Sequence, residues 1–556
     1  MTPDEILEGL NAEQRDVAES LLGPVRVLAG AGTGKTTAIT RRIAYGIASG
    51  VYDPHAVMAL TFTNRAAAEL RARLAHLGVP MVAARTFHAA ALAQLRHFWS
   101  QVFEGYPPSI LDAKLPLVLD AARSRAIDVS PAQARDIAKK IEWRKVRNLA
   151  IDDFLQLSDR SETSGLTTEA VGLVMREYEH LKLRAHTMDM EDVLLALLGV
   201  LENEPTVASQ VRTLYRVFVV DEYQDISPVQ QRLLEVWLGN RRDVCVVGDA
   251  AQTIYSFAGA SARFLLDFPQ TFPGAKTIEM VENYRSTREI VRAANTVIRG
   301  EPGAVELRSQ RSGNQLRVVE LRDRDEELGW IAQDIAARIQ SGQTPETVAV
   351  LARVGAQLDD LQTVLDRYEV RYQVKSMVPF FLRAEVSQAM LMLNAQAAQA
   401  QSDSPYIHQV ADVLRSVGWS LRPPEDRDER QRWESLQALM TVAEGMPPGS
   451  RLEDLVHELE SRRARQADPP IPGVVLSTIH AAKGLEWDTV YVAHVADGVI
   501  PYATASSAAE IAEERRLLYV AMTRARSELV LTWARRDGHG HARRRSPFLA
   551  GLTSAR

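Results

Sequence analysis

The sequence is poor in cysteine and in aromatic residues, and it contains no long uncharged apolar segment. Cys245 is the single cysteine among 556 residues, which excludes disulfide bonds and cysteine-rich metal sites. No stretch approaches the roughly 18 uncharged apolar residues that a membrane-spanning helix requires. The first ten residues, MTPDEILEGL, lack the basic and apolar regions of a secretory signal, so we expect a cytoplasmic protein without a membrane partner.

Excess positive charge is absent as well. The 65 Lys and Arg residues are outnumbered by 71 Asp and Glu residues, which gives a formal net charge of −6. Bulk charge therefore does not indicate a nucleic-acid partner, and any such binding has to be local. Two segments are locally basic, residues 139–147 (KKIEWRKVR) and residues 535–545. Each is interpreted either as a phosphate contact or as a solvated helix face or tail.

The overall composition is that of a folded protein with several domains. Apolar residues make up 46% of the chain and charged residues 24%, values that are typical of globular proteins. At roughly 150 residues per domain, a chain of 556 residues predicts three to four domains.

A glycine-rich turn follows the first apolar run. Residues 25–47 (VRVLAGAGTGKTTAITRRIAYGI) predict a strand, a loop and a helix, and the loop matches the spacing G-x-x-x-x-G-K-[ST] with Ala29 in place of the first glycine. Its glycines let backbone N–H groups close around a polyphosphate, while Lys35 would bridge the terminal phosphates and Thr36 would hold Mg²⁺. The predicted nucleotide contacts in this loop are Ala29, Gly30, Ala31, Gly32, Thr33, Gly34, Lys35, Thr36 and Thr37.

Paired acids follow a second β-rich run. Residues 216–220 (RVFVV) end in the sequence DEYQD at 221–225, and a buried strand delivers such carboxylates at its carboxyl end. In a P-loop protein an acid in this place holds Mg²⁺, and its neighbour can orient or deprotonate the attacking water. We therefore predict that Asp221 binds the metal ion and that Glu222 acts on the water.

These segments belong to a longer ordered set that resembles the UvrD/Rep/PcrA-type superfamily 1A DNA helicases. The resemblance extends from residue 10 to about residue 550 and is to the short, actinobacterial UvrD-like form without a C-terminal extension. The remaining motifs are LNAEQRDV (10–17), TFTNRAAAEL (61–70), TFHA (86–89), VVGDAAQTIYSFAGA (246–260), VENYRS (281–286), TIHAAKGLEWD (478–488) and EERRLLYVAMTRA (513–525).

The resemblance implies an α/β fold with two RecA-like P-loop motor domains, each a parallel sheet flanked by helices and each carrying a mainly helical insertion. ATP is expected to bind between the motor domains. The implied boundaries are 1–95 and 205–275 for the first motor domain with the ATP site, 96–204 for its insertion, 276–380 and 470–550 for the second motor domain, and 381–469 for a shortened second insertion.

The resemblance also implies roles at the nucleotide. Thr37 stands where relatives often have an arginine packed against adenine, so Tyr284 would stack alone or with Arg41 or Arg42. Lys35, Glu222, Gln252, Arg285 and Arg524 form the implied catalytic set. Gln14 would read the adenine edge, Tyr284 would stack on the base, Glu486 would accept a hydrogen bond from the ribose, Gln252 would sense the γ-phosphate, and Arg285 and Arg524 would stabilise its developing charge.

For single-stranded DNA, the matching motifs supply aromatic faces and polar groups. Phe62, Tyr255 and Phe257 would form base-stacking pockets, although Ala251, Phe257 and Ala258 replace the acid, tryptophan and arginine that relatives carry. Contacts to the backbone or to neighbouring bases would come from Thr61, Thr63, Asn64, Thr86, His88, Thr478 and His480.

The function implied is an ATP- and Mg²⁺-dependent motor that moves 3′ to 5′ along single-stranded DNA and unwinds duplex at junctions. It would serve repair or replication, with proteins of those processes as partners, as a monomer or as a dimer assembled on DNA. Two alternatives stay open. One is a DNA-dependent translocase that displaces bound protein but unwinds little, and the other is a scaffold subunit whose motor is inactive.

Overall fold

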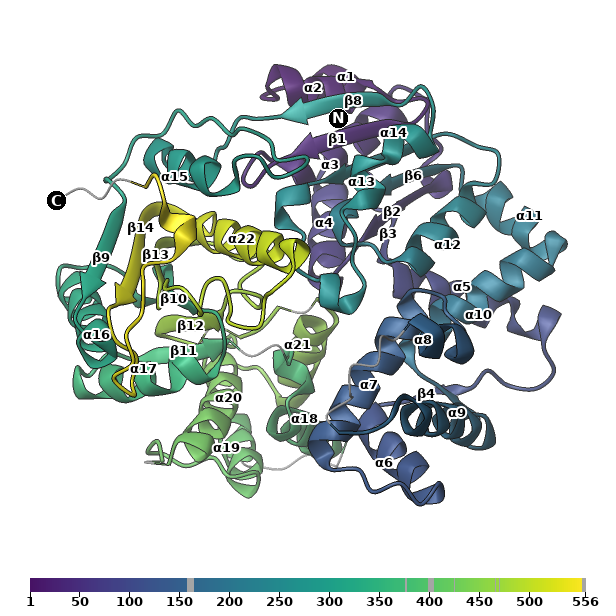
Figure 1. Ribbon diagram of the computed structural model, residues 1–556. Coiled ribbons are helices and arrows are strands. Elements are labelled where there is room, and N and C mark those ends of the chain that lie inside the picture. The colour runs from purple at the N-terminus through teal and green to yellow at the C-terminus, as the bar shows by residue number, and fades with distance from the viewer. Residues whose placement is uncertain are drawn as a thin grey trace. The chain divides into compact units, whose positions relative to one another are not determined.

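A computed structural model describes residues 1–157, 165–375, 378–398, 405–424, 426–465, 467–469 and 471–552. The chain divides into two compact units, one made of Met1–Val281 with Gly300–Glu306, and the other of Glu282–Arg299 with the chain from Leu307 onward. Each unit contains a six-stranded sheet with helices packed against it (Figure 1). The predicted α/β class is confirmed.

The sheet of the first unit has the strand order β3-β2-β6-β7-β1-β8, and every neighbouring pair is parallel. β2, β6 and β7 are buried at every position, as expected for strands covered by helices on both faces. Cys245 lies buried in β7, as its apolar setting predicted. The strands are β1 (Val25–Ala29), β2 (Val57–Thr61), β3 (Ala83–Thr86), β6 (Val217–Val220), β7 (Val244–Gly248) and β8 (Lys276–Met280).

The predicted domain boundary between residues 275 and 276 is wrong. β8 follows it directly, yet β8 pairs with β1, with Val27 opposite Ile278. The strand therefore completes the first sheet, and the first unit continues to Val281.

Helices begin directly after several of these strands. α3 (Lys35–Ala48) follows the glycine loop, α4 (Asn64–His76) follows β2, and α5 (Phe87–Val102) follows β3. Other helices of this unit are α1 (Pro3–Leu7), α2 (Ala12–Glu19), α10 (Met190–Asn203), α11 (Pro205–Leu214) and α12 (Pro228–Leu238).

The sheet of the second unit has the order β11-β12-β10-β13-β14-β9 and is also parallel throughout. Its strands are β9 (Arg317–Leu321), β10 (Val348–Ala352), β11 (Tyr372–Lys375), β12 (Val474–Thr478), β13 (Trp487–Val492) and β14 (Ala525–Ala534). Its main helices are α15 (Arg288–Ile298), α16 (Arg324–Gln340), α17 (Ala356–Arg367) and α22 (Ala508–Met522).

Two helical segments pack around hydrophobic cores of their own. Ile137 and Val174 belong to the first core, and Trp419 and Leu436 belong to the second. Residues 158–164 and 399–404 of the expected insertions lie outside the described residues. In the described ranges, no helix is long and apolar enough to cross a membrane. The helices are α6 (Lys114–Ser124), α7 (Pro131–Val146), α8 (Ile151–Leu157), α9 (Thr168–Arg184), α18 (Ala384–Ala397), α19 (Tyr406–Ser416), α20 (Arg427–Glu444) and α21 (Leu452–Arg465).

The basic segment 139–147 forms the end of α7, and two of its bases are internal. Lys145 is 1% exposed, and its ammonium lies 2.7 Å from Asp189 and 2.6 Å from Asp192. The guanidinium of Arg144 is also buried and donates to Glu179 at 2.9 Å. These two bases therefore neither contact phosphates nor form a solvated face.

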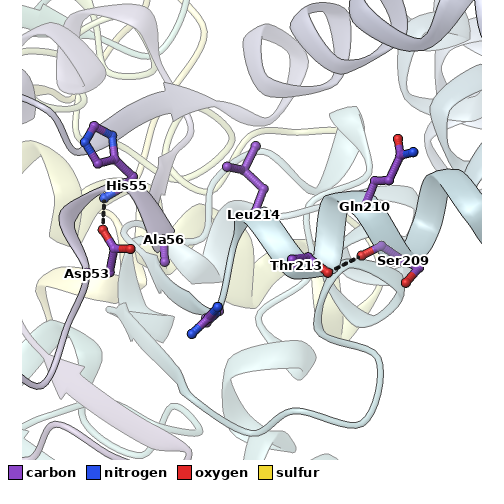
Figure 2. A pocket seen from close by; sticks show the side chains of 8 residues that line it. Asp53, His55, Ala56, Ser209, Gln210, Thr213 and Leu214 are labelled. Carbon is purple, nitrogen blue, oxygen red and sulfur yellow. Dashed lines mark hydrogen bonds between the residues drawn. The ribbon is translucent and has the colours of Figure 1, made fainter.

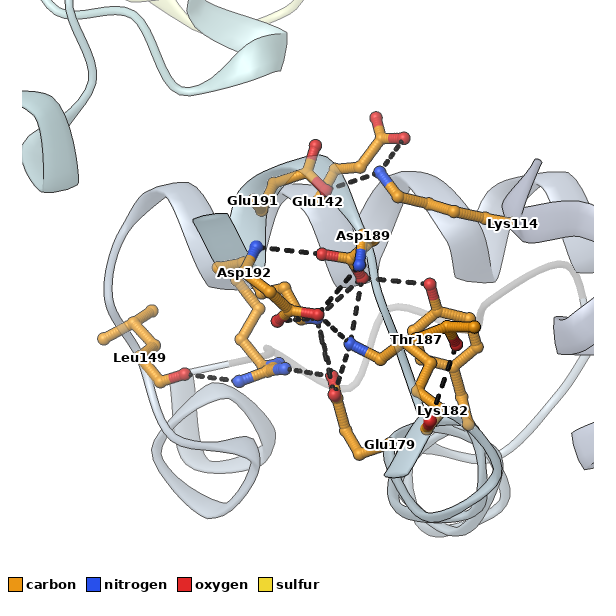
Figure 3. A network of polar contacts seen from close by, with 12 residues as sticks. Lys114, Glu142, Leu149, Glu179, Lys182, Thr187, Asp189, Glu191 and Asp192 are labelled. Carbon is orange, nitrogen blue, oxygen red and sulfur yellow. Dashed lines mark hydrogen bonds and ion pairs between the residues drawn. The ribbon is translucent and has the colours of Figure 1, made fainter. Parts of the chain in front are cut away.

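Lys145 belongs to a buried ion network that joins α7, α9 and the start of α10 (Figure 3). Lys182 from α9 pairs with Asp189, Asp192 and, at 2.7 Å, Glu179. Asp189 also accepts from the backbone of Asp192 and caps α10. The network joins the helices without leaving a net buried charge, because its three bases and three acids balance. They are Arg144, Lys145 and Lys182 with Glu179, Asp189 and Asp192.

The network stabilises the ionised carboxylates. Burial opposes the charge of Asp189 and Glu179, but Lys145 and Lys182 outweigh it and hold the pKa of both groups below their ordinary values. A carboxyl group with a lowered pKa in the folded state stabilises folding above its ordinary pKa and loses that contribution as the pH falls.

We expect Lys145→Met to lower the free energy of unfolding by about 3–5 kcal/mol, because Asp189 remains buried with part of its counter-charge removed. Urea unfolding at neutral pH measures the loss. Lys139→Met, an exposed base on the same helix, is the control and should change stability by less than about 0.5 kcal/mol.

The effect of Lys145→Met should also shrink as the pH falls below 3.8, the ordinary pKa of Asp189, since the wild-type protein then loses the same interaction. Equal unfolding of the Lys145 and Lys139 variants at neutral pH would contradict the assigned role of the network.

Candidate functional site

The glycine loop joins the carboxyl end of β1 to the amino end of α3. Gly34 has a φ of +81°, and a Cβ atom there would lie 2.6 Å from the Gln14 side-chain nitrogen. Gln14 donates from that nitrogen to the Thr33 carbonyl at 3.0 Å. A residue other than glycine would therefore be strained at position 34 and would displace Gln14 from the loop.

Three acidic residues, Asp221, Glu222 and Asp249, form an acidic corner next to this loop. Lys35 extends to 3.4 Å from the Ala29 carbonyl, and its Nζ lies 3.9 Å from Glu222 Oε1. Asp221 and Glu222 follow β6, two strands away from β1 in the sheet. Burial and the neighbouring Glu222 raise the pKa of Asp221 to about 7, against the opposing charge of Lys35. A buried carboxylate with a second, partly exposed carboxylate beside it and one ammonium nearby suits a bound cation, so Asp221 fits the predicted Mg²⁺ site.

The segment after β7 completes this corner. Asp249 and Gln252 are buried, and the Gln252 amide donates to Asp249 Oδ2 at 2.7 Å. Burial raises the pKa of Asp249. Because β1, β6 and β7 are adjacent and parallel, the structure brings Lys35, Asp221, Glu222 and Gln252 to one edge of the sheet.

Near Thr37, the structure does not leave Arg41 or Arg42 available to stack on adenine beside Tyr284. Arg42 is buried and donates to the carbonyls of Val17 and Leu21, and Arg41 donates to the carbonyls of Glu5 and Ile6. Both arginines thus tie α3 to the N-terminal helices, so the expected help in stacking adenine is not supported.

The contact to Thr37 comes from another arginine, Arg73 on α4. Its Nη1 donates to Thr37 Oγ1 at 3.3 Å, and the same guanidinium pairs with Glu69. Composition and spacing gave no sign of this contact, because α4 is separated from the glycine loop in sequence.

The second unit gathers the predicted arginines around Glu486. Arg285 pairs with Glu486 Oε2, and Arg526 pairs with Glu486 Oε1 at 2.6 Å. Burial opposes its charge, but Arg285, Arg526 and Arg524 hold the pKa of Glu486 below its ordinary value. Tyr284, next in the chain, is 50% exposed. The carboxylate predicted to meet ribose thus also fixes two guanidinium groups.

Arg524 is the most enclosed member of this cluster, at 1% exposed. Its guanidinium donates to the carbonyls of Val520 and Leu485 at 3.0 and 3.2 Å. Glu486 directly precedes β13 and Arg524 directly precedes β14, and these strands are parallel neighbours. The cluster therefore lies at the amino edge of the second sheet.

The three aromatic residues predicted to stack bases lie together. The Phe62 and Tyr255 rings are stacked, with centroids 5.8 Å apart and planes at 15°, and Phe257 meets Tyr255 edge-on at 6.1 Å. Phe62 follows β2, whereas the other two belong to the segment after β7. Phe62 is 39% exposed and Phe257 61% exposed, so this aromatic cluster offers faces to the solvent.

Three of the polar side chains predicted to contact DNA in this unit, those of Thr63, Asn64 and Thr86, bond to other groups of the protein. Thr63 caps α4 and Thr86 caps α5, each accepting from a backbone N–H. Asn64 accepts from Thr86 at 3.4 Å. Thr61 is buried at the end of β2. Of these four, Thr63 and Asn64 are exposed.

The two histidines predicted to contact DNA are half-buried. Burial and the charge of Lys114 lower the pKa of His88 to about 4, and burial with Arg353 and Lys483 lowers that of His480 to about 4. Both are therefore neutral at physiological pH and would serve as hydrogen-bonding groups rather than as positive charges. His480 follows Thr478 at the carboxyl end of β12.

A cavity of about 420 Å³ lies at the opposite edge of the first sheet (Figure 2). It is bounded by the turn before β2 and by the end of α11, which leads into β6. Its position at the amino ends of these strands separates it from the glycine loop. The lining residues are Asp53, His55, Ala56, Ser209, Gln210, Thr213, Leu214 and Arg216.

Two polar residues of the site, Arg526 and Gln224, were not predicted from the motifs. Arg526 lies two positions after Arg524, and this period of two along a strand was a usable signal for a shared face. Gln224 lies inside the DEYQD segment, fully buried against Glu222 and Asp249. An amide between acids carries no chemical signature in sequence.

The parallel sheet, the glycine loop and the carboxylates after β6 define a protein of the P-loop NTPase class. Residues 10–273 match the family described as UvrD/REP helicase N-terminal domain, and residues 278–421 and 395–536 match the UvrD-like helicase C-terminal domain. The chain therefore belongs to the UvrD/Rep family of superfamily 1 helicases, which confirms the resemblance seen in its motifs. It is an enzyme of the DNA helicase class, which uses ATP and binds DNA.

Individual relatives agree with this membership. The chain is 41% identical to the Mycobacterium tuberculosis protein named ATP-dependent DNA helicase UvrD2, over 99% of this chain and 82% of the relative. It is 30% identical to ATP-dependent DNA helicase UvrD1 of the same organism, over 96% and 83% of the two chains. Its identity to the UvrD1 protein of Mycobacterium leprae is 28%, again over 96% and 83%.

We expect Lys35→Ala to lower the rate of ATP hydrolysis by about 10²–10³, the usual cost of removing one group that stabilises developing charge. Steady-state release of phosphate measures the rate. Lys276→Ala, an exposed lysine of the same unit that pairs with Asp16, should leave it unchanged. Retained hydrolysis in Lys35→Ala would refute the phosphate site.

We expect Phe62→Ala and Tyr255→Ala each to weaken single-stranded DNA binding by about 1–3 kcal/mol, the value of one stacked base. Fluorescence anisotropy with a labelled thymidine oligonucleotide measures the affinity. Phe103→Ala is the control, since this exposed ring packs on Trp99 instead. Affinities equal to that of the control would exclude base stacking at the aromatic cluster.

Proposed function

We propose that the protein is an ATP-dependent DNA helicase that moves 3′ to 5′ along single-stranded DNA, unwinds duplex at junctions and serves DNA repair or replication. One observation supports this most: the acidic corner around Lys35 and the exposed aromatic cluster occupy the same edge of one sheet. The names of the mycobacterial relatives support the activity.

Hydrolysis follows from the chemistry of the acidic corner. The backbone N–H groups of the glycine loop and Lys35 bind the phosphates, and Glu222 accepts the proton of the water that attacks the γ-phosphorus. The bond to the bridging oxygen breaks, and ADP leaves with its electron pair. Thr36 and Asp221 would hold Mg²⁺, which neutralises phosphate charge when bound.

For the second unit, the proposal assigns Arg285 and Arg524 to the γ-phosphate charge, Glu486 to the ribose and Tyr284 to the adenine. The cluster around Glu486 supports this assignment, because an ion pair with Glu486 orients Arg285 and the carbonyls of Val520 and Leu485 orient Arg524 before nucleotide binds. Gln14 and Gln252 would contact the nucleotide from the first unit. Polarity, the DNA junction as substrate and the choice between monomer and DNA-assembled dimer rest on the family resemblance.

The second candidate is a translocase that displaces bound protein and separates little duplex. Ala258 favours it, because the family resemblance implies an arginine at this position, and that arginine would strengthen the hold on DNA. A scaffold without activity is disfavoured, since the residues that chemistry requires, Lys35, Asp221 and Glu222, are present and adjacent.

A forked duplex with a 3′ single-stranded tail separates these candidates. We expect strand separation in the presence of ATP and Mg²⁺, and little of it on a matched duplex with a 5′ tail. Glu222→Gln should bind the fork normally while its hydrolysis falls by about 10²–10⁴, the usual share of a general base. DNA-stimulated hydrolysis without strand separation would instead establish the translocase.

A further inference from the structure

Gln224 joins the two parts of the site through one side chain. It is fully buried, on the short turn between β6 and α12. Its Nε2 donates to Glu222 Oε2, and its Oε1 accepts from the Asp249 backbone N–H at 3.0 Å. One amide thus connects the carboxylate that acts on the water with the segment that leads to the aromatic cluster.

The orientation of this amide follows from its partners. Asp249 presents a backbone N–H, which requires an acceptor, whereas Glu222 and Asp225 present carboxylate oxygens, which require a donor. Gly248 leaves no free space beside it, because a Cβ there would lie 2.5 Å from Gln224 Oε1. The amide can therefore shift only together with its neighbours.

The segment that carries the aromatic residues is attached to this turn at further points. Thr253 Oγ1 donates to the Gln224 carbonyl at 3.5 Å, and the Ser261 N–H donates to the Ile226 carbonyl at 3.2 Å. These contacts flank Tyr255 in sequence on both sides. A displacement of Tyr255 by a stacked base would therefore be transmitted to the turn that holds Gln224.

Glu222 is sensitive to such a displacement. Its φ of +53° places it in the left-handed region, which a non-glycine residue keeps only where its surroundings hold it. The side-chain amide of Gln224 is one of the groups that hold it, and Lys35 Nζ lies 3.9 Å from Glu222 Oε1.

We propose that Gln224 is a positioning residue that couples base stacking at Tyr255 to the orientation of Glu222, and thereby makes hydrolysis responsive to single-stranded DNA. The inference rests on the proposed function, because it requires a motor that DNA stimulates. Gln224 touches neither nucleotide nor DNA in this account and acts through Glu222.

The test compares ATP turnover with and without saturating thymidine oligonucleotide in the wild type, Gln224→Met and Gln224→Glu. Met removes both hydrogen bonds at similar volume, and Glu replaces the amide donor by a carboxyl group among acids, which keeps a hydrogen bond to Glu222 only while it is protonated. We expect the ratio of turnover with DNA to turnover without DNA to fall about 5- to 150-fold, the usual range of a coupling between two sites. The KM for ATP and the affinity for the oligonucleotide should stay at wild-type values.

Gln231→Met is the matched control, since Gln231 is a buried amide of the same region that bonds to Tyr223 and Glu235 instead. Its ratio should equal that of the wild type. If DNA stimulates the wild type but both Gln224 variants keep the wild-type ratio, the inference is wrong and the proposed function is unaffected. The same conclusion follows if Gln231→Met lowers the ratio as much as the Gln224 variants do. A wild type that DNA does not stimulate would contradict the proposed function and the inference with it. If Gln224→Met does not fold, Gln224→Leu, which also removes both hydrogen bonds without adding charge, decides.

Discussion

In the first unit every neighbouring pair of strands runs parallel, and the whole site depends on this constraint. Parallel pairing brings the segments that follow β1, β2, β6 and β7 to one edge. The glycine loop, the aromatic side chains and the paired acids come from distant parts of the chain, and only this edge brings them together. An antiparallel strand in the middle of the sheet would send its following segment to the opposite edge.

The charges at this edge explain why nucleotide and metal ion suit it. Asp221 and Asp249 are buried, and burial raises the pKa of both carboxyl groups. Lys35 is the nearby base that opposes the shift at both. A further cation brought by a polyphosphate would favour the ionised carboxylates, so binding and charge at this corner support each other.

The second unit uses its sheet differently. Its arginine cluster lies at the amino ends of β13 and β14, whereas Thr478 and His480 lie at the carboxyl end of β12. Residues assigned to nucleotide and to DNA therefore occupy opposite edges of this sheet. In the first unit both groups share one edge, which is why a direct coupling residue such as Gln224 is found there.

Much of this arrangement was predictable, because the chemistry demands recognisable residues in a recognisable order. The apolar runs before Gly30 and Asp221 predicted β1 and β6 correctly. β8 was misassigned because its sequence, KTIEM, alternates exposed and buried positions at the sheet edge instead of forming an apolar run.

Other features were beyond a single sequence for a physical reason. The sequence around Lys145 predicts a base on the surface. The fold instead places it in the interior, where Asp189 and Asp192, more than forty residues away in sequence, neutralise its charge. Arg42 likewise reads as a helix surface residue but bonds to carbonyls of α2 and the turn after it. Burial of a charge depends on partners distant in sequence, and local pattern does not reveal them.

The central proposal is that single-stranded DNA bound at this sheet edge drives hydrolysis at Lys35 and Glu222. The most direct measurement is steady-state ATP hydrolysis by the wild-type protein with and without single-stranded DNA, at two salt concentrations. We expect strong stimulation by DNA that weakens at higher salt when DNA is limiting, because binding to DNA phosphates releases counterions. Equal hydrolysis with and without DNA would contradict the proposal.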